Sequence, residues 1–111
     1  MINNHFDPDA IFAELEKAAE AFVEKEEELE LLGAFEDKLL AQLIDEEREI
    51  GTPATLAKEL SKKNEKWQTH RKGKAEAKKR YRKAKLHYEN LVILKDLRIT
   101  QESSMRAMRV T

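Results

Sequence analysis

The chain has 111 residues, of which 39% are charged and 6% are aromatic, and it contains no cysteine. This composition excludes disulfides, thiolate metal sites and cysteine nucleophiles, and it leaves too few large apolar residues for a thick globular core. The net charge of −1 conceals an asymmetry: residues 1–50 hold 16 acidic and 4 basic side chains, whereas residues 51–111 hold 6 acidic and 17 basic ones. High charge is also typical of disorder, but the apolar residues recur at helical spacing. We therefore expect one all-α domain.

The first, acidic helix is predicted over residues 7–50, after an N-terminal arm of residues 1–6. Asp7 has the side chain of an N-cap. Pro8 suits the first helical position, because the N–H that proline lacks would be unpaired there. The N-terminus does not resemble a signal peptide, and no apolar run approaches the roughly 20 residues of a membrane span. We expect a cytoplasmic protein that does not enter a membrane.

Within this helix the apolar residues follow the alternating three- and four-residue spacing of a coiled-coil seam. The seam positions are Ile11, Leu15, Ala18, Phe22, Lys25, Leu29, Leu32, Glu36, Leu39, Leu43, Glu46 and Ile50. After them, Gly51 suits a left-handed C-terminal residue, Thr52 an N-cap and Pro53 the first position of a new helix. The chain is therefore expected to reverse direction at Gly51.

A second, basic helix is predicted over residues 51–99, followed by a disordered C-terminal tail of residues 100–111. Its seam is weaker and consists of Leu60, Lys63, Trp67, His70, Lys74, Ala77, Tyr81, Ala84, Tyr88 and Leu91. Gly33 and Gly73 lie inside the two helices, where each costs about 1 kcal/mol relative to alanine. Helix breaks at these glycines, giving four shorter helices, are the alternative to a long antiparallel hairpin.

The turn at Gly51 predicts the register of this hairpin. Phe35 then lies opposite Trp67, and Leu32 lies opposite His70. The acidic cluster Glu24, Glu26, Glu27, Glu28 and Glu30 faces the basic side chains Arg71, Lys72, Lys74 and Lys78. An exposed ion pair contributes only about 0–1 kcal/mol, so these charges are expected to select the register more than to stabilise it.

A second apolar stripe lies outside the predicted seam. It comprises Leu86, Ile93 and Leu97 of the second helix, with Phe12, Ala19 and Val23 of the first helix nearby. A helix that is apolar on several faces must be buried on several faces. We therefore expect self-association, in which two hairpins form a dimeric four-helix bundle, or else a groove for a different protein.

The basic residues near the middle of the second helix are candidate nucleic-acid contacts. They are Lys78, Lys79, Arg80, Arg82, Lys83 and Lys85. A basic helix with interleaved aromatic residues, here Trp67 and Tyr81, can follow a phosphate backbone and stack bases. The alternative is that these charges neutralise the acidic helix and solvate a surface. No helix-turn-helix, zinc-finger or basic-zipper pattern accompanies them.

The sequence offers no catalytic, cofactor or metal site. The acidic run Glu24–Glu30 lacks the Glu-x-x-His pattern of di-iron bundles, and no Ser/His/Asp set can be placed with His5, His70 or His87. His70 falls on the seam, where a partly buried structural histidine is expected. The sequence predicts a non-enzymatic interaction or assembly protein without a small-molecule substrate. A nucleic-acid-binding accessory protein is the alternative.

Overall fold

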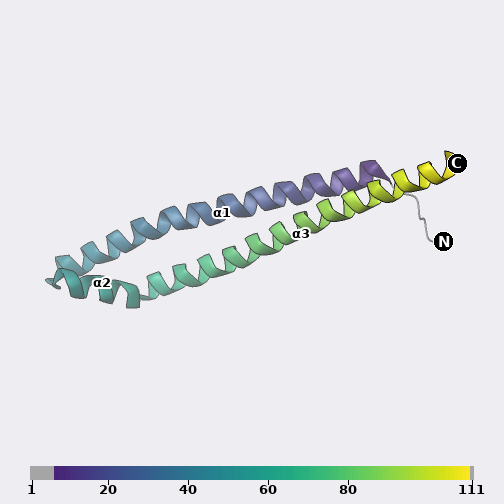
Figure 1. Ribbon diagram of the computed structural model, residues 1–111. Coiled ribbons are helices and arrows are strands. Elements are labelled where there is room, and N and C mark those ends of the chain that lie inside the picture. The colour runs from purple at the N-terminus through teal and green to yellow at the C-terminus, as the bar shows by residue number, and fades with distance from the viewer. Residues whose placement is uncertain (1–6, 111) are drawn as a thin grey trace. The chain divides into compact units, whose positions relative to one another are not determined.

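The computed structural model describes residues 7–110, and side chains up to residue 108. The described residues form three α-helices and no strand: α1 (Pro8–Glu49), α2 (Ala54–Lys63) and α3 (Glu65–Val110) (Figure 1). The predicted all-α antiparallel helical hairpin is confirmed. The chain divides into a hairpin unit, Lys25–Tyr81, and a terminal unit, which holds the residues before and after it. The predicted N-terminal arm, residues 1–6, lies outside the described residues.

The cap predicted at the start of α1 is confirmed. Asp7 Oδ1 accepts hydrogen bonds from the backbone N–H groups of Asp9 (3.0 Å) and Ala10 (3.3 Å). Pro8 is the first helical residue, as its missing donor predicts. The carboxylates of Asp7 and Asp9 also lie at the positive end of the helix dipole, where negative charge is favourable.

Gly51 ends α1 in the predicted left-handed conformation, with a φ of 93°. The N–H of Gly51 donates to the carbonyl of Arg48 (3.0 Å) and that of Thr52 to the carbonyl of Glu47 (3.1 Å), which is the Schellman pattern. The predicted roles of Thr52 and Pro53 are wrong by one position, because Pro53 holds the N-cap of α2. Thr52 Oγ1 instead donates to Glu47 Oε2 (3.0 Å) and ties the turn back to α1.

The single second helix predicted over residues 51–99 is wrong, because the chain breaks at Asn64. This residue has an extended ψ of 140° and ends α2 by donating its N–H to the carbonyl of Ser61 (3.2 Å). Its side-chain Oδ1 accepts from the N–H of Lys66 (2.8 Å) and thereby caps α3. An asparagine side chain offers the backbone an alternative to continuous helical hydrogen bonds, so one residue closes one helix and opens the next.

The core of the hairpin unit is a cluster of Leu39, Leu43 and Trp67, against which Leu40 packs. On α1, every predicted seam position up to Leu43 is buried or half-buried, so the seam is confirmed over that stretch. The last two predicted positions, Glu46 and Ile50, are exposed.

The seam also departs from the prediction on α2. Leu60 and Lys63 are exposed, whereas Ala57 and Ser61 are buried. Ser61 Oγ donates to the carbonyl of Ala57 (2.7 Å), which satisfies the buried hydroxyl. The break at Asn64 shifts the inward face by one residue, and the predicted seam resumes on α3 from Trp67.

The predicted register of the hairpin unit is wrong by about one helical turn or more. Phe35 lies beside His70, with ring centroids 5.5 Å apart, and Trp67 packs with Leu39 and Leu43 instead. The predicted register assumes one continuous helix after Gly51. The interposed α2 and its break from α3 change which residues of α3 reach α1.

In the terminal unit α1 and α3 pack through the seam predicted for them. Ala18 and Leu91 are buried, and the rings of Phe22 and Tyr88 stack with centroids 6.0 Å apart. Helix α3 continues to Val110, so the disordered tail predicted from residue 100 is wrong over the described part of the chain.

The three glycines predict stability effects of opposite sign. Gly33 and Gly73, where the alternative to a long hairpin places helix breaks, lie inside α1 and α3, and a Cβ added at either would meet nothing within 4 Å. We expect Gly73→Ala to raise the free energy of unfolding by about 0.5–1 kcal/mol, because alanine favours the helix. We expect Gly51→Ala to lower it by about 1–2 kcal/mol, because a β-carbon clashes in the left-handed region. Urea unfolding followed by circular dichroism measures both changes. Effects of the same sign would contradict the left-handed conformation of Gly51.

Candidate interaction faces

Glu36 is the acidic residue that joins α1 to α3 most closely in the hairpin unit. Its largely buried carboxylate accepts a hydrogen bond from Arg71 Nη1 to Oε1 (3.0 Å) and one from Lys74 Nζ to Oε2. The hydrogen bond from Lys74, followed by that from Arg71, lowers the pKa of Glu36 against the opposing effect of desolvation. Two cations of α3 therefore meet at one position of α1, which fixes the register there.

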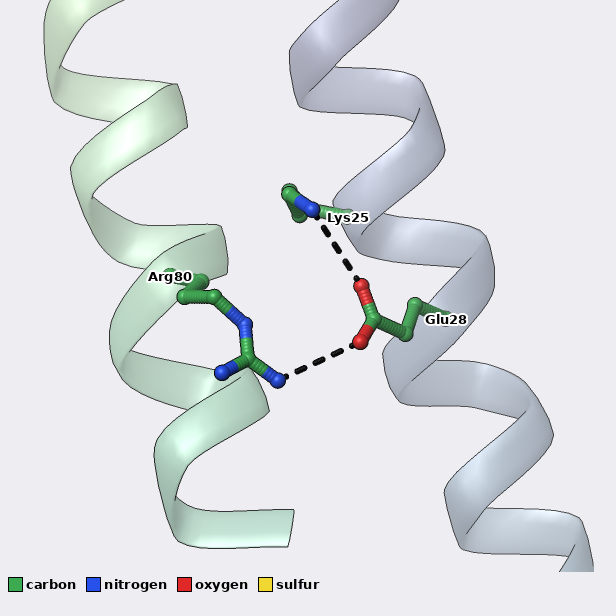
Figure 2. A network of polar contacts seen from close by, with 3 residues as sticks. All are labelled: Lys25, Glu28 and Arg80. Atoms are coloured by element: carbon green, nitrogen blue, oxygen red, sulfur yellow. Dashed lines mark hydrogen bonds and ion pairs between the residues drawn. The ribbon is translucent and has the colours of Figure 1, made fainter. Parts of the chain in front are cut away.

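A second ion pair joins the same two helices at Glu28 (Figure 2). Arg80 Nη2 reaches from α3 to Glu28 Oε1 (3.2 Å), and Lys25 Nζ, one turn away on α1, lies 3.5 Å from Oε2. These side chains are more exposed than Glu36. A pair of this kind contributes about 0–1 kcal/mol, so it supports the register set by Glu36 without dominating it.

Fewer charged residues form ion pairs between the helices than the sequence predicts. Among the described residues, the ion pairs between helices are those of Glu36 with Arg71 and Lys74, and that of Glu28 with Arg80. Within the acidic run Glu24–Glu30, Glu28 is the one carboxylate that the described structure pairs. Most charges of the acidic α1 and the basic α3 therefore stay on the surface.

The six candidate nucleic-acid contacts are all exposed on α3. Arg80 is held by Glu28, whereas the structure forms no ion pair within residues 7–108 for the other five, which are Lys78, Lys79, Arg82, Lys83 and Lys85. Lys78, Lys79 and Arg80 belong to the hairpin unit, and the other three to the terminal unit. Trp67 is buried in the core, as its seam position predicts, and is not available to stack on a base.

The six residues of the predicted apolar patch lie in the terminal unit but not on one face. Leu86, Ile93 and Leu97 are 56–58% exposed. With 3.6 residues per turn, they project from the side of α3 opposite its seam. The α1 members lie on a flank about a quarter turn from the α1 seam: Phe12 and Val23 are half exposed and Ala19 is partly buried. The expected single patch is therefore two separate stripes, because the α3 residues project away from the α3 seam whereas the α1 residues project to one side of the α1 seam.

We call the exposed face of α3 opposite its seam the outward stripe. Its positions alternate four and three residues apart and are all exposed: Lys79, Lys83, Leu86, Asn90, Ile93, Leu97, Thr100 and Ser104. The stripe is basic at its start, apolar from Leu86 to Leu97 with one amide at Asn90, and hydroxylic beyond. Helix α3 thus carries a second heptad pattern besides the seam that faces α1. The sequence interpretation missed Asn90, although its spacing from Leu86 and Ile93 marks it.

His70 is buried, as its seam position predicts, and its ring centroid lies 5.5 Å from that of Phe35 and 6.2 Å from that of Trp67. Its Nε2 finds no hydrogen-bond partner in the described chain and is shielded from solvent. An open groove of about 460 Å³ beside it is lined by Phe35, Leu39, Glu65, Lys66, Thr69 and His70. The shielded nitrogen is not offered to a ligand in this groove. His87 is exposed beside Glu14 and Lys17, and His5 lies outside the described residues.

The described residues offer neither a metal site nor a helix that could cross a membrane. They contain no group of three or more His, Asp or Glu side chains placed to hold a metal ion. In the same part of the chain, no helix combines the length and apolarity that crossing a membrane requires. Comparison with known protein families, curated proteins and solved structures finds no match.

Glu36→Gln tests the contact that sets the register. The substitution keeps the shape of the side chain but removes the charge that Lys74 and Arg71 bind, so we expect the free energy of unfolding at pH 7 to fall by about 1 kcal/mol. A carboxylate with a lowered folded pKa contributes stability above its unfolded pKa and loses it as the pH falls through the folded one. The difference between Glu36→Gln and the unmodified chain should therefore shrink as the pH drops below the ordinary value of 4.5.

Urea unfolding at neutral and acidic pH measures this difference. Glu30→Gln is the matched control, because Glu30 is exposed and forms no ion pair within the described chain. We expect it to change the stability by less than about 0.5 kcal/mol. A Glu36→Gln effect that is equally large at acidic pH would contradict the ionic contact.

Proposed function

We propose that this chain is a non-enzymatic interaction protein of the cytoplasm, which self-associates through the outward stripe of α3. One observation carries the proposal: Leu86, Ile93 and Leu97 are each more than half exposed, although the opposite face of α3 already packs on α1. Apolar side chains at heptad spacing fit a second helix. A second copy of the chain is the proposed occupant, and a helix of a different protein is the alternative.

The size of the stripe predicts weak association. Its three apolar residues, Leu86, Ile93 and Leu97, make a small interface between two helices. We therefore expect the dimer to form and separate with protein concentration in the micromolar range.

Ile93→Asp is expected to abolish self-association, because it places a charge at the centre of the stripe. Leu31→Asp is the matched control, since Leu31 is 72% exposed on α1 in the hairpin unit, away from the stripe. Size-exclusion chromatography with light scattering at about 100 µM should give the mass of two chains for the unmodified protein and the control, and of one chain for Ile93→Asp.

Circular dichroism of both variants shows whether the helices persist. A single-chain mass for all three helical proteins would contradict self-association. A two-chain mass for Ile93→Asp would place the interface elsewhere on the chain.

The second candidate is a nucleic-acid-binding accessory protein. What favours it is that five exposed cations of α3 have no ion pair within the described residues. Binding to a phosphate backbone releases counterions, so the affinity would fall steeply as salt rises. We rank it second because exposed basic residues are common on ordinary solvated faces, whereas apolar side chains at heptad spacing are typical of a helix-packing face.

A Lys79→Glu/Lys83→Glu variant tests this candidate, with Lys58→Glu/Lys62→Glu as the control of equal charge change on α2. Fluorescence anisotropy with single- and double-stranded oligonucleotides at about 20 mM salt measures the binding. The candidate predicts that the α3 variant loses at least about tenfold more affinity than the control. Absence of binding at low salt, or equal losses in both variants, would contradict it.

A further inference from the structure

We infer that the second copy packs its own α3 against the outward stripe in parallel and in register, so that Asn90 of one copy faces Asn90 of the other. This inference rests on the proposed self-association and specifies its geometry. On the outward stripe a four-residue step leads from Leu86 to Asn90, and a three-residue step from Asn90 to Ile93. In heptad terms Leu86 and Ile93 therefore occupy d positions, and Asn90 and Leu97 occupy a positions.

The amide of Asn90 distinguishes the two orientations. In a parallel, in-register pair each a residue meets its own copy, so one Asn90 amide can donate to the oxygen of the other. In an antiparallel pair an a residue meets a d residue, and alignment of Leu86 with Leu97 sets Asn90 against Ile93. An amide buried without a partner costs about 1–3 kcal/mol, and the antiparallel dimer would contain two of them. A single asparagine at an a position specifies register and strand number in the same way in other coiled coils.

An antiparallel register displaced by one heptad also fits less well. It would place Asn90 against Thr100, whose hydroxyl already donates to the carbonyl of Asp96 (2.9 Å) and could therefore only accept from the Asn90 amide, leaving the amide oxygen without a donor. It would also place Leu86 against Ser104, which removes one of the apolar layers on which the association depends. The parallel register keeps Leu86, Ile93 and Leu97 each against its own copy.

The charges beside the stripe agree with the parallel orientation. In a parallel pair a g residue lies near the e residue five positions later on the partner, which pairs Glu89 with Leu94 and Asp96 with Gln101. No like charges meet at these positions. The antiparallel alignment of Leu86 with Leu97 brings Glu89 of each copy beside Asp96 of the other, and like charges there are destabilising.

The same stripe indicates where the pairing begins and how many chains it joins. In a parallel pair Lys83 faces Lys83 and Lys79 faces Lys79, so close packing is expected only from Leu86 onward. Ile93 at d and Leu97 at a would by themselves favour three or four strands. Asn90 at a favours two, and the repulsion among the lysines grows with each added strand.

Disulfide trapping decides the orientation, because the chain has no cysteine of its own. Ser104→Cys occupies an a position near the end of the stripe, so a parallel dimer brings the two thiols within bonding reach, as a disulfide requires Cα atoms about 4.4–6.8 Å apart. An antiparallel dimer instead links mixed variants: Lys83→Cys with Thr100→Cys in one register, or Leu86→Cys with Ser104→Cys in the displaced one. Non-reducing gels after equilibration in a glutathione redox buffer measure the linked fraction.

The inference predicts that Ser104→Cys links to itself at least about tenfold more than either mixed pair links, at a protein concentration where the unmodified chain is dimeric. Predominant linkage in a mixed pair would overturn the parallel orientation and leave self-association intact. A dimer in which no pair links would also overturn it, because parallel, in-register packing on the stripe must bring the two Ser104→Cys thiols together. An unmodified chain that stays monomeric would overturn both the inference and the proposed function.

Discussion

Packing of α1 against α3 is the interaction on which every other feature depends. A helix rich in charged residues gains little from propensity alone, so most of its stability must come from the apolar face that it buries. In the hairpin unit that burial centres on Trp67 with Leu39 and Leu43. Glu36 then selects the register, because Arg71 and Lys74 must both reach its carboxylate. Once this face of α3 is used, its opposite face is left exposed with Leu86, Ile93 and Leu97.

The sequence predicts well those features that depend on local chemistry. Asp7 caps α1 through its own carboxylate, and Gly51 turns the chain because its φ of 93° disfavours other residues. The seam positions follow from spacing along one helix. The start of α3 was missed because Asn64 is a weak signal: its break depends on a side-chain oxygen that bonds Lys66 rather than on the absence of a backbone donor. The register then failed as well, since every pairing beyond the turn depends on where α3 begins.

The two halves of the charge asymmetry do not simply neutralise each other. Glu28 and Glu36 account for the ion pairs between helices in the described structure, while Glu30, Lys79 and many others remain at the surface. Such charges keep a helical surface soluble and discourage association of like faces. The apolar part of the outward stripe is one of the places on α3 where large apolar side chains are exposed, and its position could be predicted from heptad spacing. Its separation from Phe12 and Val23 follows from the same spacing, because Phe12 and Val23 lie about a quarter turn from the α1 seam whereas the stripe lies opposite the α3 seam.

We propose that a second helix covers the outward stripe of α3. Sedimentation equilibrium of the unmodified chain over about 1 to 200 µM tests this proposal. We expect a mass that rises with concentration from one chain toward two, with helical circular dichroism throughout. A mass of one chain across the whole range, with the helices intact, would contradict it.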